Sequence, residues 1–224
     1  MNIPKKLSIA IDGPAASGKS TTARLLAKKL GYIYIDTGAM YRAATLAVLK
    51  KDINPEDSKN AGKAVAESEI SIKIILQEQH TFLDGEDVSK KIRTPEIDRN
   101  ISVIATNTDI RKIMVAQQQR LAEQGGVVMD GRDIGTVVLP DADLKVFMIA
   151  SIEARAKRRL QDQAEHNLTL QEIKDDIERR DFADMNRSDG PLKKAEDARE
   201  LDNSNLSIDD QVDQIYKWVN ELIA

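Results

Sequence analysis

Apolar and polar positions follow two different periods along the first fifty residues. Residues 7–11 and 32–35 are short apolar runs, each followed directly by an aspartate, and such runs are typical of buried strands. Residues 19–30 and 40–50 instead repeat their apolar positions at the helical spacing, and Gly31 is a stop signal after the first of these segments. Strands that alternate with helices predict a parallel sheet with crossover helices.

The pattern changes between residues 52 and 98. Ile70, Ile72 and Ile74 alternate with polar residues, which is the period of a half-buried strand. A second short apolar stretch follows among the turn residues of 84–87. We therefore expect a small antiparallel sheet within residues 52–98, inserted into the α/β pattern.

Helical periodicity returns from residue 95 and again alternates with short apolar runs. This second half of the chain therefore continues the α/β pattern of the first fifty residues. The predicted helices cover 110–124, 152–161, 169–184 and 208–222, and the predicted strands cover 127–129, 144–149 and a short segment that ends at Leu201.

The composition narrows the class of protein. The chain has 224 residues, 41% hydrophobic and 31% charged, which excludes a disordered chain, and it has no cysteine, which excludes disulfides and thiolate metal sites. Its net charge of −4 provides no basic field to hold nucleic acid. No segment approaches the roughly 20 apolar residues of a membrane helix. We expect a cytoplasmic protein with no nucleic-acid polymer as partner and no membrane.

One motif indicates that the chain binds phosphate groups. Residues 13–20 read Gly-Pro-Ala-Ala-Ser-Gly-Lys-Ser and match the phosphate-binding loop G-x-x-x-x-G-K-[ST] between a predicted strand and a predicted helix. Glycines let backbone N–H groups surround phosphate oxygens, and the helix presents its positive end. Lys19 supplies a charge to the phosphates, and the Ser20 hydroxyl is a candidate Mg²⁺ ligand.

Polar residues follow two of the other predicted strands. Asp36 and Thr37 come after the second strand, with Thr37 placed to cap the next helix and Arg42 about one turn into it. The segment 130–133 (Asp-Gly-Arg-Asp) follows the strand 127–129. Ligands bind at the carboxyl ends of parallel strands, so both segments are candidates for one site.

Arginines recur at helical spacing in the last third of the chain. Arg180, Asp184 and Arg187 are predicted to share one helix face, and Arg155 and Arg159 share a face of the preceding helix. Alone, such sets are typical of solvated surfaces. Beside a phosphate-binding loop they favour a phosphate clamp, because the planar guanidinium fork matches phosphate oxygens.

Four segments together resemble one family. Residues 11–20, 36–42, 130–138 and 184–187 are similar to the motifs of the bacterial cytidylate kinases, which are P-loop nucleoside monophosphate kinases. The second and third segments are long and therefore more specific than the P-loop, and the likeness covers almost the whole chain. The resemblance implies one nucleoside monophosphate kinase domain over 1–224. This α/β domain would contain a parallel five-stranded sheet in the order 2-3-1-4-5 flanked by helices, a monophosphate-binding insert at 52–98 and a helical lid at about 155–187.

The same resemblance implies roles for individual residues. The backbone and side chains of the P-loop would bind ATP, with Arg155 and Arg159 from the lid. The ATP-binding set would be Gly13, Pro14, Ala15, Ala16, Ser17, Gly18, Lys19, Ser20, Thr21, Arg155 and Arg159. The residues closest to the transferred phosphoryl group would be Lys19, Arg132, Arg180 and Arg187.

The acceptor nucleotide would be bound by a second set. Its phosphate would contact Thr37, Arg42, Arg93, Arg132 and Arg180; its cytosine Ser102, Arg111 and Asp133; and its ribose Asp184. An acceptor carboxylate at Asp133 matches the N4 amino group of cytosine, whereas the carbonyl of uracil would be repelled.

The sequence thus predicts phosphoryl transfer from ATP to CMP or dCMP, with Mg²⁺, in a monomeric enzyme. Two alternatives remain open at this point. One is a P-loop kinase for another acceptor, against which Asp133 and Ser102 argue. The other is a non-enzymatic regulator that binds nucleotide, which would bind ATP without CMP-dependent release of ADP.

Overall fold

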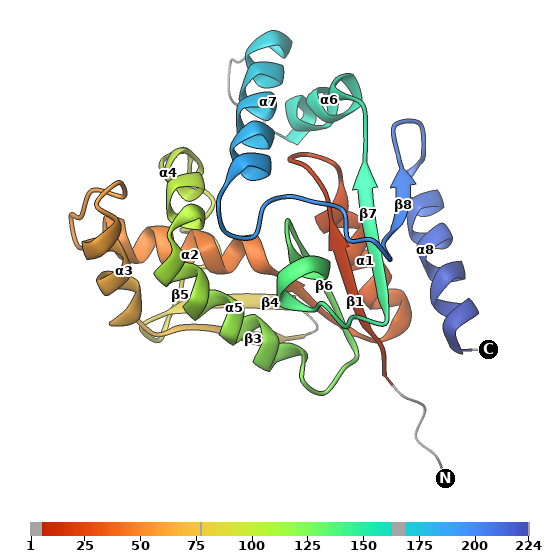
Figure 1. Ribbon diagram of the computed structural model, residues 1–224, viewed down its shortest axis with the longest axis horizontal. Coiled ribbons are helices and arrows are strands. Elements are labelled where there is room, and N and C mark those ends of the chain that lie inside the picture. The colour runs from red at the N-terminus through yellow and green to blue at the C-terminus, as the bar shows by residue number, and fades with distance from the viewer. Residues whose placement is uncertain (1–5, 77, 163–168, 224) are drawn as a thin grey trace. The chain divides into compact units, whose positions relative to one another are not determined.

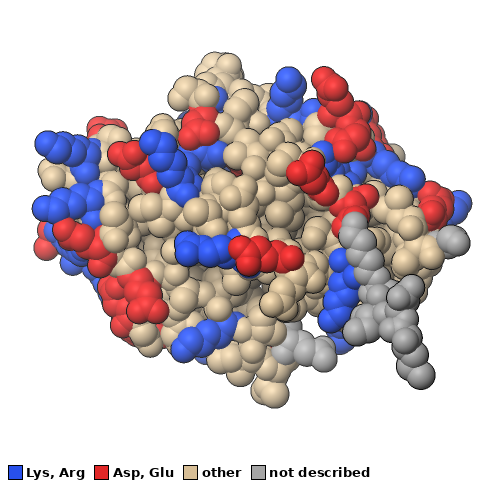
Figure 2. Space-filling view, turned by 60° about the horizontal axis from the view of Figure 1, so that its bottom comes forward, with Lys and Arg blue, Asp and Glu red and all other residues tan. Residues whose placement is uncertain are grey.

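The computed structural model describes residues 6–76, 78–162 and 169–223 (Figure 1). The chain packs as two compact units. The first, here the P-loop unit, comprises Met1–Tyr34 and Gln124–Ala224, and the second, here the central unit, comprises Ile35–Glu123. No helix within the described ranges is long and apolar enough to cross a membrane. On the face drawn in Figure 2, basic and acidic side chains are interspersed.

A five-stranded sheet forms the core of the P-loop unit. Its strand order is β2-β6-β1-β7-β8, which is 2-3-1-4-5 when these strands are numbered along the chain, so the predicted order is confirmed. The pairings of β1 with β6, of β1 with β7 and of β7 with β8 are all parallel. The strands are β1 (Ser8–Asp12), β2 (Ile33–Asp36), β6 (Val127–Gly131), β7 (Leu144–Ile149) and β8 (Arg199–Asp202). The last two residues of β2 already belong to the central unit.

The central strand β1 is apolar because both of its faces are covered. Ile9 pairs with Val128 on one side and with Leu144 on the other, and its side chain is fully buried. Leu26 and Ile215, from the helices that flank the sheet, belong to the same core (Figure 1). The helices of this unit are α1 (Lys19–Leu30), α6 (Ile152–Asp162), α7 (Leu170–Asn186) and α8 (Ile208–Ile223), with the π-helix η1 (Ile134–Val138).

Local signals set the ends of two of these helices as predicted. Gly31 ends α1 in the left-handed conformation, with φ of 67°. Thr169 begins α7 with a capping box, in which its side chain and that of Glu172 each bind the other residue's backbone N–H. The sequence did not predict η1, whose Val-rich segment has no helical period.

The described part of the central unit contains four helices and a small sheet. The antiparallel order β3-β4-β5 confirms the predicted sheet within 52–98, whereas α3 lies in the same segment and was not predicted. Asp36, not Thr37, caps α2, because its carboxylate accepts a hydrogen bond from the Ala39 N–H at 3.0 Å. The elements are α2 (Thr37–Leu49), α3 (Ser58–Ala66), β3 (Ile70–Ile75), β4 (Glu78–Leu83), β5 (Glu86–Asp87), α4 (Pro95–Thr106) and α5 (Thr108–Ala122).

Asp12, the last residue of β1, connects the central strand to η1. Its carboxylate is buried and accepts hydrogen bonds from the N–H groups of Ile134 and Gly135, both at 2.8 Å. Burial, only partly offset by these two donors, raises the pKa of Asp12 to about 6. A buried carboxylate with this pKa makes folding stability depend on pH.

Gly125 is required where the chain turns from α5 into β6. It has φ of 63°, and a Cβ there would lie 2.2 Å from the carbonyl oxygen of Lys6. We expect Gly125→Ala to lower the free energy of unfolding by about 3 kcal/mol, from left-handed strain plus a backbone clash. Gly31→Ala is the matched control: its φ is similar but nothing lies within 4 Å, so we expect a loss of about 1 kcal/mol. Urea unfolding of both variants measures the difference, and equal losses would contradict the proposed clash.

Asp12→Asn tests the buried carboxylate. Below about pH 4, Asp12 is protonated in both the folded and the unfolded chain; between about pH 4 and pH 6 the folded chain holds the proton more tightly. The stability that Asp12 contributes is therefore lost as pH rises through 6. Relative to the variant, we expect wild type to lose about 2 kcal/mol of unfolding free energy between pH 4 and pH 7.

Urea unfolding of wild type and Asp12→Asn at each pH measures this change. Asp209→Asn, which removes an exposed carboxylate, controls for the general loss of one negative charge. If the difference in unfolding free energy between wild type and Asp12→Asn stays constant with pH, burial does not raise the pKa of Asp12.

Candidate active site

The P-loop crosses from β1 to α1 with its glycines at two tight points. A Cβ on Gly13 would lie 2.3 Å from the carbonyl oxygen of Met148 in β7, so only glycine permits this close approach. Gly18 precedes α1 in the left-handed conformation, with φ of 86°. The Nζ of Lys19 donates to the Pro14 carbonyl at 3.2 Å. This lysine therefore lies folded back over its own loop.

Lys19 is a buried cation among other charges. Burial, together with the charge of Arg132, lowers the pKa of Lys19 to about 8. The carboxylates of Asp130, Asp184 and Asp12 act in the opposite direction and favour its charged form. A buried lysine whose charge is made costly by burial gains strongly from an anionic partner, which suits it to phosphate.

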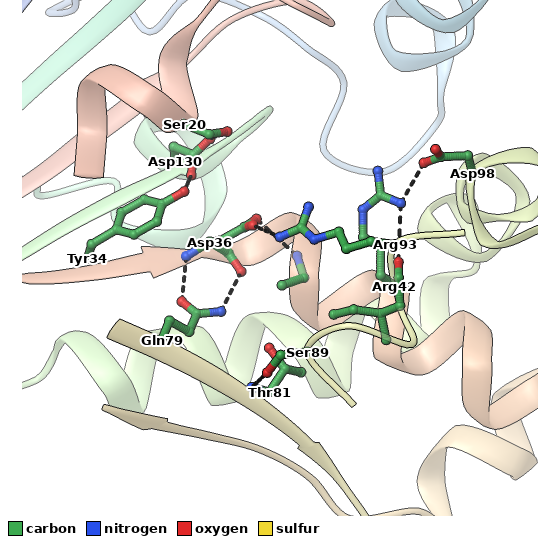
Figure 3. A network of polar contacts seen from close by, with 12 residues as sticks. Ser20, Tyr34, Asp36, Arg42, Gln79, Thr81, Ser89, Arg93, Asp98 and Asp130 are labelled. Atoms are coloured by element: carbon green, nitrogen blue, oxygen red, sulfur yellow. Dashed lines mark hydrogen bonds and ion pairs between the residues drawn. The ribbon is translucent and has the colours of Figure 1, made fainter. Parts of the chain in front are cut away.

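Ser20, Asp130 and Tyr34 form a hydrogen-bonded group beside the loop (Figure 3). The Ser20 hydroxyl donates to Asp130 Oδ2 at 2.6 Å, and the Tyr34 hydroxyl donates to Asp130 Oδ1 at 2.9 Å. A hydroxyl and a carboxylate in contact are oxygen ligands of the kind that Mg²⁺ prefers. The residues present therefore fit a magnesium ion. Asp130 was not among the predicted ligands, although its place at the end of a strand next to β1 was the available signal.

Two ion pairs place the 130–133 segment against the end of α7. Arg132 Nε contacts Asp184 Oδ2 at 2.6 Å, and Arg187 Nη2 contacts Asp133 Oδ1 at 3.2 Å. Both side chains of the second pair are buried. Burial disfavours the charge of Arg132, but the carboxylates of Asp184, Asp181 and Asp130 together outweigh it, and the pKa of Arg132 is raised. Arg132, Asp133, Asp184 and Arg187, all predicted site residues, therefore form two ion pairs between the same two segments.

One part of the arginine prediction is wrong. α7 ends at Asn186, and Arg187 follows it with an extended backbone (ψ of 142°), so Arg187 does not share a helix face with Arg180 and Asp184. Arg180 remains on the helix and pairs with Asp176, one turn earlier, at 3.2 Å. The chain leaves the helix early enough to direct Arg187 to the buried Asp133 instead.

The helices α6 and α7 are bound to the P-loop through a residue that the sequence did not single out. Asp181 of α7 accepts a hydrogen bond from the Ala15 N–H at 2.9 Å and pairs with Arg155 of α6. Arg155 also donates to the Ala15 carbonyl at 3.2 Å. Arg155 is therefore next to the loop, and Arg159 lies one turn further along α6.

The central unit holds the other predicted arginines in ion pairs (Figure 3). Arg42 Nη1 contacts Asp98 Oδ1 at 2.5 Å, and Arg93 Nη2 contacts Asp36 Oδ2 at 2.6 Å. The side-chain amide of Gln79 binds both the N–H and the carbonyl of Asp36, at 2.7 and 3.2 Å. Gln79 was not predicted; it fixes the backbone from which α2 begins.

The remaining predicted residues lie on three helices of the central unit. Arg111 of α5 is 1% exposed and donates to the Tyr41 hydroxyl of α2 at 3.4 Å. Thr37 is buried in the first turn of α2, and Ser102 is half-buried on α4. A buried arginine needs polar partners, because an unpaired charge away from water is costly.

Comparisons with known proteins agree on one family. The family model for cytidylate kinase matches residues 9–221. The chain is 49% identical to a cytidylate kinase of Bacillus cereus (strain ATCC 10987 / NRS 248) over 98% of this chain and 99% of that one. It is 50% identical to a cytidylate kinase of Bacillus anthracis (strain CDC 684 / NRRL 3495) over 94% and 95% of the two chains.

A solved structure supports the fold alone. A gluconokinase from Sinorhizobium meliloti 1021 aligns with a TM-score of 0.52 and 14% identity over 99% of this chain and 95% of that one. The sequence matches, by contrast, are 49% and 50% identical over nearly the full length of both chains. The chain therefore belongs to the cytidylate kinase family.

Proposed function

We propose that this protein transfers the γ-phosphoryl group of ATP to CMP and dCMP, giving ADP and CDP or dCDP. The observation that carries the proposal is the match to the cytidylate kinase family over residues 9–221. That range contains the P-loop and every other residue of the proposed site. The protein acts as a monomer on small-molecule substrates in the cytoplasm.

The domain organisation belongs to the same proposal. One nucleoside monophosphate kinase domain spans 1–224, with residues 52–98 as the monophosphate-binding insert and about 155–187 as a lid over ATP. Two contacts within the P-loop unit support the lid: Asp181 and Arg155 connect α7 and α6 to Ala15. Residues 163–168 of the proposed lid lie outside the described residues.

The donor nucleotide is bound by the backbone of residues 13–21 and by Lys19. Ser20 and Asp130 hold Mg²⁺, which when bound supplies positive charge against the phosphates. Their contact at 2.6 Å supports this assignment, because it gathers two oxygen ligands at the start of α1. Arg155 and Arg159 add positive charge from α6.

The phosphate of the acceptor is bound by arginines that hold carboxylates in this structure. Arg42 pairs with Asp98 and Arg93 pairs with Asp36. A dianionic phosphate competes for such guanidinium groups, since charge-assisted bonds to phosphate have the same fork geometry. The phosphate-binding residues are Thr37, Arg42, Arg93, Arg132 and Arg180.

The base and sugar are recognised by polar side chains. Asp133 accepts from the N4 amino group of cytosine, and a uracil carbonyl at that position would face a carboxylate. Arg111 and Ser102 complete the contacts to the base, and Asp184 accepts from the ribose. The burial of Arg111 and Asp133 supports this, because a hydrogen bond to a base is electrostatically stronger where water is excluded.

Charge neutralisation carries the chemical step. The phosphate of CMP is already an anionic nucleophile near neutral pH, so no general base is needed. Lys19, Arg132, Arg180 and Arg187 stabilise the charge on the equatorial oxygens of the transferred group. The ion pairs of Arg132 and Arg187 keep both guanidinium groups fixed before substrate arrives, which lowers the cost of ordering them.

Release of ADP tests the function directly. Wild type with Mg·ATP is assayed against CMP, dCMP, UMP, AMP, GMP and no acceptor. We expect rapid release with CMP and dCMP and far slower release with every other acceptor. Preference for another monophosphate would keep the fold and discard the assignment of the base. Binding of ATP without acceptor-dependent release would favour a regulator.

Asp133→Asn tests recognition of the base while keeping the size of the side chain. Loss of the charge-assisted bond to cytosine is expected to raise KM for CMP about tenfold and leave KM for ATP within a factor of about two. Asp141→Asn is the control, since it removes an exposed carboxylate from the same unit. Equal increases in both KM values would indicate that Asp133 has a structural or metal-binding role and does not recognise the base.

A further inference from the structure

A buried polar cluster lies behind the P-loop. The carbonyl oxygen of Ser17 accepts two hydrogen bonds, from Asn203 Nδ2 at 2.7 Å and from Arg158 Nη1 at 3.2 Å. Asn203 is fully buried directly after β8, and Arg158 lies on α6. Neither residue was predicted, because neither belongs to a motif and both are far from the loop in sequence.

The cluster is closed by further bonds among its own members. Arg158 donates to the side-chain oxygen of Asn203 at 3.1 Å and to its carbonyl at 2.7 Å. Gln211 Oε1 of α8 accepts from Asn203 Nδ2 and from the Thr22 hydroxyl of α1, both at 2.9 Å. Both polar atoms of the Asn203 side-chain amide are therefore bonded in one orientation. Such a cluster is rigid, because rotating any member leaves a buried polar group unpaired.

The geometry of one peptide bond connects this cluster to the direction of the Gly18 N–H. The described residues contain no cis peptide, and in a trans peptide the C=O and the following N–H point in opposite directions. Holding the Ser17 carbonyl toward Asn203 thus directs the Gly18 N–H away from the cluster. A cation on the carbonyl oxygen also polarises the peptide, which makes that N–H a stronger donor.

We propose that Asn203 and Arg158 are positioning residues for ATP, which fix the Ser17–Gly18 peptide so that the Gly18 N–H meets a phosphate oxygen. The inference rests on the proposed function, because it assumes that the P-loop binds ATP. The packing around Gly18 supports it: a Cβ there would lie 3.5 Å from Asn203 Nδ2 and 3.7 Å from Arg158 Nη1. The cluster therefore packs directly against the loop at Gly18.

Binding measurements separate this role from a merely structural one. Calorimetric titration with Mg·ATP and, separately, with CMP is carried out on wild type, Asn203→Ala, Arg158→Ala and Arg158→Lys. We expect both alanine variants to bind ATP about tenfold more weakly and CMP within a factor of about two of wild type. Arg158→Lys keeps a cationic donor and is expected to recover part of the loss.

Matched controls come from the same segments. Lys157→Ala removes an exposed cation from α6, and Asn205→Ala removes an exposed amide two residues after Asn203. Both are expected to bind ATP like wild type. Thermal unfolding of each variant identifies any that fails to fold. If Asn203→Ala fails to fold, the Arg158 pair decides the question, because Arg158 is only half-buried.

Two results would overturn the inference. In one, Arg158→Ala binds ATP as tightly as wild type. In the other, it loses affinity for ATP and CMP equally, which would indicate a general structural defect. A different experiment decides the proposed function, which fails if wild type releases no ADP in the presence of CMP. In that case the ATP titration of the variants still tests the positioning role.

Discussion

A P-loop can turn its backbone N–H groups toward phosphate only if its other polar groups find partners elsewhere. In this protein the partners come from several different elements. Lys19 of α1 donates to the Pro14 carbonyl, Arg155 of α6 to the Ala15 carbonyl and Asn203 after β8 to the Ser17 carbonyl. Asp181 of α7 accepts from the Ala15 N–H. The loop's conformation is therefore held by side chains from much of the P-loop unit.

Buried charge is the second constraint, and pairing resolves it. Taking an ion out of water costs several kcal/mol, so a buried ion persists only with partners. Arg187 has Asp133, Arg132 has Asp184, and Asp12 has two backbone donors. The two ion pairs hold the guanidinium groups of Arg132 and Arg187 in fixed positions. A site whose chemistry consists of charge neutralisation benefits from such preorganisation.

Sequence reasoning was most successful where the signal is local. The strands and most helices were predicted from periodicity, and Gly31 and Thr169 were recognised as helix boundaries because their effect reaches only a few residues. The helix α3 was missed because its buried residues are mainly alanines and a glycine, which give a weak apolar period; its packing and a bond from Asn107 to the Ser58 carbonyl hold it. The π-helix η1 depends on Asp12, more than 120 residues earlier.

The sequence by itself determined the P-loop, the α/β pattern and, through its resemblance to a family, the strand order and the residue types of the site. Only the tertiary structure decided which charges pair. It places Arg187 on Asp133, assigns the cap of α2 to Asp36 and brings Asn203 to Ser17. The reason is distance along the chain. A motif encodes the backbone of its own few residues, whereas the partner of a buried side chain is fixed by how the strands and helices pack.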